Sequence, residues 1–446
     1  MTPRPFAGRH IGFWMTVALV MGNMIGSGIF LLPSSLAPFG GFGILGWIVS
    51  AAGSIMLALV FARLARFDPA AGGPYAYTRA AFGDLAGFLV AWGYWISVWC
   101  GNAAIAIAFV GSLEPFAPTL VHTPASAAVL AAGAVWLLTA VNVWGIRTAG
   151  QVQLFTTVLK ILPLAVIGVA GMIHFTPSHF VFVAASGRQA AGKLAAAATL
   201  TFWAFGGLES ATIPAGSIRD PERTIPRATI LGTLLSAVLY IVASIGVASV
   251  IAPNALSTAP APFADAARVL FGPGAGALMA LGAAVACFGA LNGWILIAGQ
   301  VPMAIARDGL FPRMFARMST RDTPAVGLVI SSALTTALIV MNSSRGLVDL
   351  FTFVILLGTL NALVPYAFCS LAGLMTEHRR RHVSSPVSRG ATAIACLAFA
   401  YSFWAISGAG AEVVYWGFLL LLLGVPAYVW MVRHSSIRPS IGPDGR

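Results

Sequence analysis

Residues 20–30 read VMGNMIGSGIF and lie within the first long apolar segment of the chain. Three glycines and two polar residues fall within the seven positions from Gly22 to Gly28. Each glycine costs a helix about 1 kcal/mol relative to alanine. We therefore expect the helix to be interrupted here, which leaves backbone amide and carbonyl groups free to bind a ligand.

Residues 202–210 read FWAFGGLES and repeat this pattern in the second half of the chain, with a glycine pair beside an acid. The two stretches lie in the first helices of two successive five-helix blocks, which predicts an inverted repeat with a site between the breaks. Amide groups that start a resumed half-helix can hold a carboxylate, and carbonyls that end the preceding half can hold an ammonium. The alternative for the glycines is close helix packing. Two matched stretches favour recognition of an α-amino acid.

The surrounding sequence is typical of a polytopic membrane protein. Of its 446 residues, 59% are hydrophobic and 9% are charged, whereas soluble domains carry about 25% charged residues. Helices are the expected spanning structure, because lipid offers backbone groups no partners and the segments are too long for barrel strands. We predict an all-α membrane protein with twelve transmembrane helices. They span residues 11–32, 42–64, 85–112, 125–145, 152–174, 195–216, 228–251, 276–305, 324–341, 348–375, 391–408 and 413–432.

The basic residues predict the orientation of the chain. With the N-terminus inside, 20 Lys and Arg residues fall on the cytoplasmic side, 4 fall in outer loops, and Lys160 lies inside a span. This asymmetry predicts that both termini face the cytoplasm. It also places the net charge of +12 beside lipid headgroups. We therefore expect the lipid bilayer, and no nucleic acid, as a partner.

Two ionisable residues lie well inside predicted spans, the acid Glu209 and the base Lys160. A charge at the centre of a membrane helix costs about 2.5–3.5 kcal/mol on insertion scales, so both are candidates for protonation or gating. The alternatives are a helix-bridging hydrogen bond for Glu209 and snorkelling to an interface for Lys160. The spacing of the four cysteines resembles no metal site, and we expect neither a metal nor a cofactor.

Four further polar or aromatic residues lie within spans: Tyr94, Asn102, Trp294 and Tyr366. Single tryptophans and tyrosines of this kind serve mostly as interface anchors or packing residues. An aromatic surface beside an amide can also hold an ammonium or a guanidinium through cation–π contact and hydrogen bonding. Both interpretations stay open for these residues.

Several motifs carry a resemblance to a known family. They read GNMIGSGIFLLP at 22–33, GGPYAY at 72–77, WAFGGLES at 203–210, DGLFP at 308–312 and LVPY at 363–366. Over nearly its whole length the chain resembles the amino acid–polyamine–organocation superfamily, and within it the bacterial basic amino acid/polyamine antiporters, especially the arginine/agmatine exchanger.

The resemblance implies a fold with a five-plus-five inverted repeat, in which helices 1 and 6 are discontinuous. It also implies two peripheral helices, a homodimer, and a place in the bacterial inner membrane. The corresponding parts are a cytoplasmic tail at 1–10, two halves at 11–174 and 195–375, peripheral helices at 391–432 and a second cytoplasmic tail at 433–446.

The resemblance further implies how the backbone of a substrate is held. Ser27 and the Gly28 amide would bind the carboxylate, and carbonyls near Met24, Trp203 and Gly206 would receive the α-amine. Trp203 would also close the site from outside.

The remaining roles concern the inner barrier and the distal end of a substrate. Tyr94, Glu209 and Tyr366 match the residues that form the inner barrier of the arginine exchanger. Asn102 and Trp294 match its residues that contact the guanidinium.

The chain also departs from the arginine exchanger at several positions. Val98 and Gly358 stand where that exchanger has small polar side chains near the guanidinium, and Ser97 replaces an alanine. Lys160 replaces an apolar residue, and lysine is found there in proton-coupled and broad-range members. Tyr75 matches a residue tied to acid sensitivity. The departures from the exchanger, unlike the match at Tyr75, weaken the inference of strict arginine/agmatine exchange and favour proton-coupled uptake.

Together these features predict a secondary active transporter that works by alternating access, and no enzyme. The leading hypothesis is exchange of a cationic amino acid for a related amino acid or its decarboxylated amine. The second is proton-coupled uptake of neutral or mixed amino acids, with Lys160 or Glu209 carrying the proton. A third, a receptor that binds an amino acid without moving it, is disfavoured because no soluble signalling domain is attached.

Overall fold

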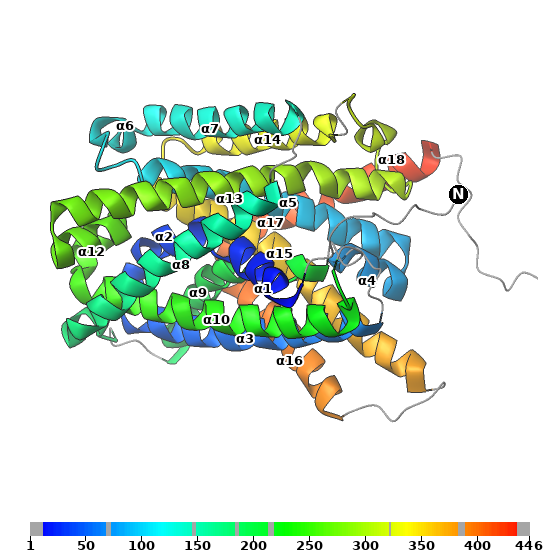
Figure 1. Cartoon of the computed structure of the whole chain (residues 1–446). Helices are drawn as coiled ribbons and strands as arrows, with labels where there is room; N and C mark the ends of the chain where they lie inside the picture. Colours follow the sequence, from blue (N-terminus) through cyan, green and yellow to red (C-terminus); the bar gives the residue numbers. More distant parts are fainter. Residues whose placement is uncertain are drawn as a thin grey trace, which may run out of the picture.

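The computed structural model describes residues 12–67, 73–144, 149–182, 187–212, 218–320, 323–381 and 389–434. Figure 1 shows the arrangement of its helices, coloured along the sequence. The α-helices are α1 Phe13–Met24, α2 Ser27–Leu36, α3 Gly41–Phe67, α4 Pro74–Phe82, α5 Asp84–Gly111, α6 Pro118–His122, α7 Pro124–Trp144, α8 Ala149–Ile173, α9 Gly187–Phe202, α10 Pro221–Val250, α11 Pro253–Leu256, α12 Pro262–Phe271, α13 Pro273–Arg307, α14 Ala325–Met341, α15 Leu347–Arg381, α16 Arg389–Ser407, α17 Ala411–Leu422 and α18 Gly424–His434.

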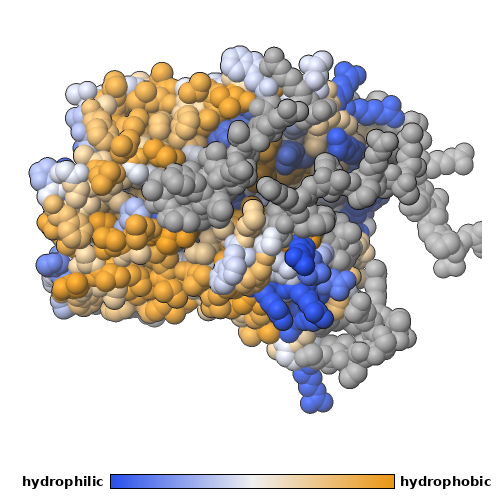
Figure 2. Space-filling view, in the orientation of Figure 1, coloured by the Kyte–Doolittle hydropathy of each residue, from blue (hydrophilic) through white to orange (hydrophobic). Residues whose placement is uncertain are grey.

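Eight helical stretches of the described chain are long and apolar enough to cross a bilayer: α3, α5, α7, α10, α13, α15, α16 and the combined α17–α18. The bent pair α1–α2 brings this number to nine if it forms one span. A hydrocarbon core about 30 Å thick needs about 20 apolar residues in a helix, which these elements supply. Figure 2 shows apolar side chains over most of one face, with hydrophilic residues gathered at the end where α4 and α18 lie. The chain is therefore a helical, multi-pass membrane protein.

Three of the predicted spans correspond to shorter apolar elements. The segment 324–341 forms α14, which has 17 residues. The described apolar part of 152–174 is Lys160–Ile173. In the segment 195–216, α9 ends at Phe202 and short 3-10 turns follow it. Twelve spanning helices thus stay a prediction.

The helices form two groups around a central helix, α5, which is buried along nearly its whole length. Helices α7, α13 and α14 lie on one side of the molecule, and α3 and α10 pack together on the other, with α1 and α2 between them (Figure 1). Helix α15 makes the most extensive contact with α5. This arrangement brings both glycine-rich stretches to the middle of the protein.

Hydroxyl groups on α14 form hydrogen bonds that connect α14 to α5 and to α7. Trp95 Nε1 donates to Ser331 Oγ at 2.8 Å, and Thr335 Oγ1 donates to the Trp99 carbonyl at 3.0 Å. Thr139 and Ser332 share a 2.6 Å hydrogen bond between α7 and α14. Such bonds act between helices where lipid provides no hydrophobic driving force for their association. They hold α5, which forms one wall of the site, in a defined position.

Candidate functional site

The first glycine-rich stretch joins two helices that differ in direction by 41°. Helix α1 ends at Met24 and α2 begins at Ser27, and between them Ile25 and Gly26 have non-helical backbone angles. No side chain caps the N-terminus of α2. Because the first four N–H groups of a helix have no partner within it, the amide of Gly28 is available to a ligand.

The second stretch leaves α-helical geometry in the same region. After α9, a 3-10 turn covers Trp203–Phe205, Gly206 has ψ 130°, and Gly207 has φ +101°. A Cβ atom on Gly207 would lie 3.2 Å from Cβ of Asn23 and 3.3 Å from its carbonyl carbon. The backbones of the two stretches are therefore in direct contact, and only glycine fits at this crossing.

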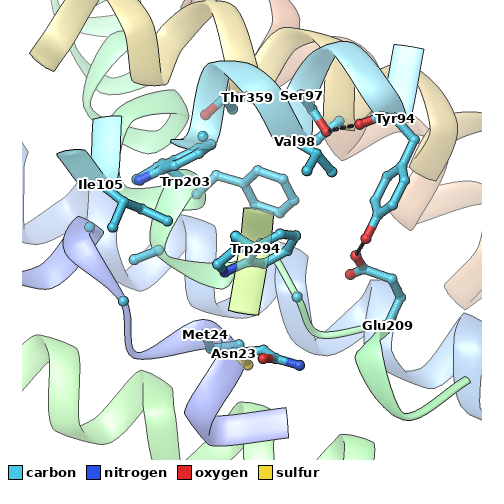
Figure 3. A pocket seen from close by; sticks show the side chains of 18 of the residues that line it. Asn23, Met24, Tyr94, Ser97, Val98, Ile105, Trp203, Glu209, Trp294 and Thr359 are labelled. Atoms are coloured by element: carbon cyan, nitrogen blue, oxygen red, sulfur yellow. Dashed lines mark hydrogen bonds between the residues drawn. The ribbon is translucent and has the colours of Figure 1, made fainter. Parts of the chain in front are cut away.

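A cavity of about 60 Å³ lies between the two stretches and helices α5, α13 and α15 (Figure 3). It has room for a few water molecules. Residues from the predicted site that line it are Met24, Gly28, Tyr94, Ser97, Trp203, Gly206, Glu209, Trp294 and Tyr366. The wall is mostly apolar, and a few polar groups converge on it, which is the usual character of a small-molecule site.

At one end of the cavity, Glu209 is bound by two tyrosines. Tyr94 on α5 donates its hydroxyl to Oε1 of Glu209 at 2.7 Å, and Tyr366 on α15 donates to Oε2 at 2.5 Å (Figure 3 shows the former). The Glu209 side chain is fully buried, with 0% exposure. Hydrogen bonds of this kind to a carboxylate are among the stronger ones in proteins. The triad ties α5 and α15 to the second stretch.

A second, larger cavity of about 450 Å³ borders the triad at Tyr94. Its lining includes Tyr75, Ser210 and Gln300, and it shares Asn23 and Tyr94 with the first cavity. The wall between the two cavities therefore consists of side chains and not of a complete helix. The second cavity extends toward α4 and the C-terminal part of α13.

Two other predicted residues lie outside the first cavity. Lys160 on α8 is buried, and its Nζ approaches the carbonyl of Ile25 in the first break at 3.5 Å. Tyr75 on α4 donates a 2.8 Å hydrogen bond to Oδ2 of Asp308, and Arg79 donates to the same oxygen at 3.1 Å. Burial, and then the bond to Asp308, raise the pKa of Tyr75 well above its ordinary value. The Tyr75 hydroxyl is accordingly protonated at neutral pH, and its link to acid sensitivity stays a prediction.

Two predicted substrate-binding residues are placed differently from the rest. Asn102 is buried at 1% exposure, does not line the cavity, and its Oδ1 has no hydrogen-bond partner among the described residues. Ser27 begins α2, but its side chain lies outside the described part of the structure.

Sequence analysis did not identify three polar or small residues of the cavity: Asn23, Gly101 and Thr359. Thr359 precedes Tyr366 by seven residues, and a helix returns to the same face after seven residues. Its Oγ1 is buried without a partner in the described structure. Its helical spacing from Tyr366 is the feature of the sequence by which Thr359 could have been identified.

No group of three or more His, Cys, Asp or Glu side chains suited to a metal ion occurs among the residues that the structure describes. The polar groups of the first cavity are instead backbone groups, hydroxyls, indoles and one carboxyl group. The side-chain amide of Asn23 also belongs to this set.

Comparison with known proteins agrees with this description. Residues 11–439 match the family model of the amino acid permeases. The cadaverine/lysine antiporter of Escherichia coli (strain K12) is 34% identical over 371 residues, covering 81% of this chain and 82% of that protein. The putrescine transporter PotE of the same strain is 31% identical over 428 residues, covering 94% and 95%. A Bacillus subtilis (strain 168) protein provisionally named an arginine/ornithine antiporter is 34% identical over 434 residues, covering 89% and 91%. The chain belongs to the amino acid permease family, a family of membrane transport proteins within the amino acid–polyamine–organocation superfamily.

Proposed function

We propose that this protein is an antiporter of the bacterial inner membrane that exchanges a basic amino acid for a related amino acid or its decarboxylated amine. The observation that carries the proposal is the enclosed cavity between two non-helical stretches, with an acid at one end. The names of the similar proteins, which describe exchange or transport of lysine, cadaverine and putrescine, support a cationic substrate.

The substrate backbone binds at the two breaks. The amide of Gly28, with Ser27 beside it, holds the carboxylate, because the N-terminus of α2 carries a partial positive charge. Carbonyls near Met24, Trp203 and Gly206 receive the α-amine. Trp203 closes the cavity on the side away from Glu209.

Movement of the substrate follows from alternating access. The triad of Tyr94, Glu209 and Tyr366 forms the inner barrier, and the second cavity is the route to the cytoplasm. The protein changes conformation more readily with substrate bound than when it is empty, because the substrate binds the two conformations with different affinity. No step forms a covalent bond.

The distal end of the cavity binds the side-chain cation through Trp294 and Ser97. Ser97 Oγ donates to the Tyr94 carbonyl at 2.7 Å, which leaves its lone pairs free to accept from an ammonium. Val98, which also lines this cavity, adds no polar group. A compact primary ammonium therefore fits this end better than a guanidinium, which has five donors to satisfy.

Replacing Trp294 with leucine is expected to lower the affinity for lysine and arginine about tenfold, because a desolvated cation–π contact is worth up to about 2 kcal/mol. Binding is measured by calorimetry on purified protein. The matched control is Trp144→Leu, since Trp144 on α7 is 69% exposed and distant from the cavity lining. Unchanged lysine and arginine binding in the Trp294 variant would remove the proposed role of this indole.

The test of the proposed function is counterflow in proteoliposomes. Vesicles loaded with lysine, ornithine, arginine or a diamine should take up labelled basic amino acid, whereas empty vesicles should not. Neutral amino acids inside the vesicles should not support uptake. Absence of exchange with every basic amino acid and diamine tested contradicts the proposal.

A second candidate is proton-coupled uptake, and the position of Lys160 favours it. The ammonium group faces the Ile25 carbonyl in the first break, where loss of a proton changes the charge beside the substrate site. Uptake into empty vesicles driven by an inward proton gradient supports this candidate and opposes obligate exchange.

The finer architecture belongs to the same proposal. We propose twelve spans in a five-plus-five inverted repeat, with halves at 11–174 and 195–375, discontinuous helices 1 and 6, and both termini in the cytoplasm. Helices α16–α18 overlap the predicted peripheral segment 391–432, and we propose a homodimer.

A further inference from the structure

The indole of Trp203 lies against glycines from three helices. A Cβ atom on Gly28 of α2 would lie 3.0 Å from Cδ1 of Trp203, one on Gly101 of α5 would lie 2.9 Å from Cη2, and one on Gly358 of α15 would lie 3.0 Å from Cζ3. Unstrained carbon–carbon contacts are about 3.5–4.0 Å long. None of the three positions accepts a side chain unless the ring moves. We call Gly28, Gly101 and Gly358 the indole seat.

Gly358 differs from the other two glycines because it lies behind the ring. Gly28 and Gly101 line the first cavity, whereas Gly358 does not. In Figure 3, Trp203 lies between Thr359, the neighbour of Gly358, and Trp294. A methyl group on Gly358 has little space to turn away, since it would also lie 3.4 Å from Cβ of Cys100. It therefore pushes the ring toward the cavity.

The orientation of the indole relates this displacement to substrate length. The five-membered ring lies at the first break, beside Gly28, and the six-membered ring reaches α5 and α15. A substrate whose carboxylate and α-amine bind at the breaks extends its side chain along the ring toward α5. Displacement of the six-membered ring consequently shortens the distal end of the cavity and leaves the anchoring end unchanged. Because the cavity has a volume of only about 60 Å³, a ring displaced into it directly reduces the space for a substrate side chain.

We propose that Gly358 determines the length of the substrate that the site accepts, because its missing side chain lets Trp203 withdraw toward α15. The inference rests on the proposed function, since it needs a basic amino acid anchored at the two breaks. Lysine and ornithine differ by one methylene group, and an apolar pocket can discriminate one methylene by about 10- to 200-fold. A comparison of lysine with ornithine therefore measures the length available at the distal end of the cavity.

The experiment is Gly358→Ala, with lysine and ornithine binding and exchange measured side by side. Lysine affinity should fall about tenfold, as expected for overpacking by one methyl group, and ornithine affinity should fall less than about threefold. The lysine/ornithine preference thus shifts toward ornithine. Folding should be unaffected, since alanine is a better helix former than glycine. The control is Gly373→Ala on the same helix, where the new Cβ meets Cγ1 of Val60 at an ordinary 3.6 Å and the preference should not change.

A double variant tests whether Trp203 transmits the effect. Trp203→Phe removes the ring atoms Cζ3 and Cη2, so Gly358→Ala should no longer change the lysine/ornithine preference in this background. A shift that persists with phenylalanine, or an equal loss for both substrates in the single variant, overturns the inference. A wild-type protein that binds both amino acids and fails these tests contradicts only the role of Gly358. A wild-type protein that binds neither contradicts the proposed function as well.

Discussion

Exchange by a Glu209→Gln variant is expected to fall about 10- to 100-fold. The carboxyl group accepts hydrogen bonds from Tyr94 and Tyr366 on its two different oxygens. Glutamine keeps one acceptor oxygen and places an amide donor opposite the other hydroxyl, so that hydrogen bond must reverse and the tyrosine proton loses its acceptor. A hydrogen bond to a charged group contributes about 1.5–3 kcal/mol, and an unsatisfied buried partner costs more. The barrier between the two cavities should loosen, and the first cavity loses the acidic group in its lining.

The measurement is the initial rate of lysine exchange in proteoliposomes, together with lysine binding to the purified variant. Tyr94→Phe and Tyr366→Phe each remove one of the two bonds and should give smaller losses than Glu209→Gln. Glu412→Gln is the control, because this acid forms a surface ion pair with Arg345 at 2.6 Å, and surface pairs contribute little. Wild-type exchange rates in the Glu209 variant would rule out the barrier role.

The second large effect is expected for Gly207→Ala, which should abolish measurable substrate binding. Gly207 has φ +101°, where a side chain is strained, and its Cβ would lie 3.2 Å from Cβ of Asn23. Strain of this kind costs about 1–3 kcal/mol, and the contact also forces the two breaks apart. The substrate carboxylate and α-amine then no longer find their partners at the correct separation.

Gly272→Ala separates strain from contact. Gly272 has a similar φ of +93°, but a Cβ there would meet no atom within 4 Å. Thermal unfolding should show a loss of stability in both variants, whereas only Gly207→Ala should lose lysine binding. Equal binding losses in the two variants would show that general destabilisation, and no local geometry, explains the result.

The helical membrane fold was predictable because apolar length is a direct consequence of bilayer thickness. The two glycine-rich stretches were recognisable for a similar reason, since glycine lowers helix stability wherever it occurs. The end of α9 at Phe202 was harder to locate within the predicted segment 195–216. Hydropathy does not register where the backbone leaves helical geometry inside an apolar segment.

The direction in which a side chain points from its helix axis was the main feature that could not be predicted from the sequence. Ser97, Gly101 and Ile105 on α5 are spaced by four residues and line the cavity. Asn102 is one residue further along, and one residue turns a helix by about 100°. Val98 follows Ser97 by the same single step and lines the cavity, whereas Asn102 does not, so helical spacing alone does not place this side chain. Packing of α5 against its neighbours decides this angle, and packing is a property of the whole fold.

The shared wall between the two cavities has a consequence for how tightly transport is coupled. Because Tyr94 and Asn23 border both spaces, rotation of single side chains suffices to connect them. Tyr94 is buried at 8% exposure, so its rotation first requires its hydrogen bond to Glu209 to break. In the proposed transport cycle, the hydrogen bond from Tyr94 to Glu209 therefore opposes slippage, which is the escape of cargo without a return load.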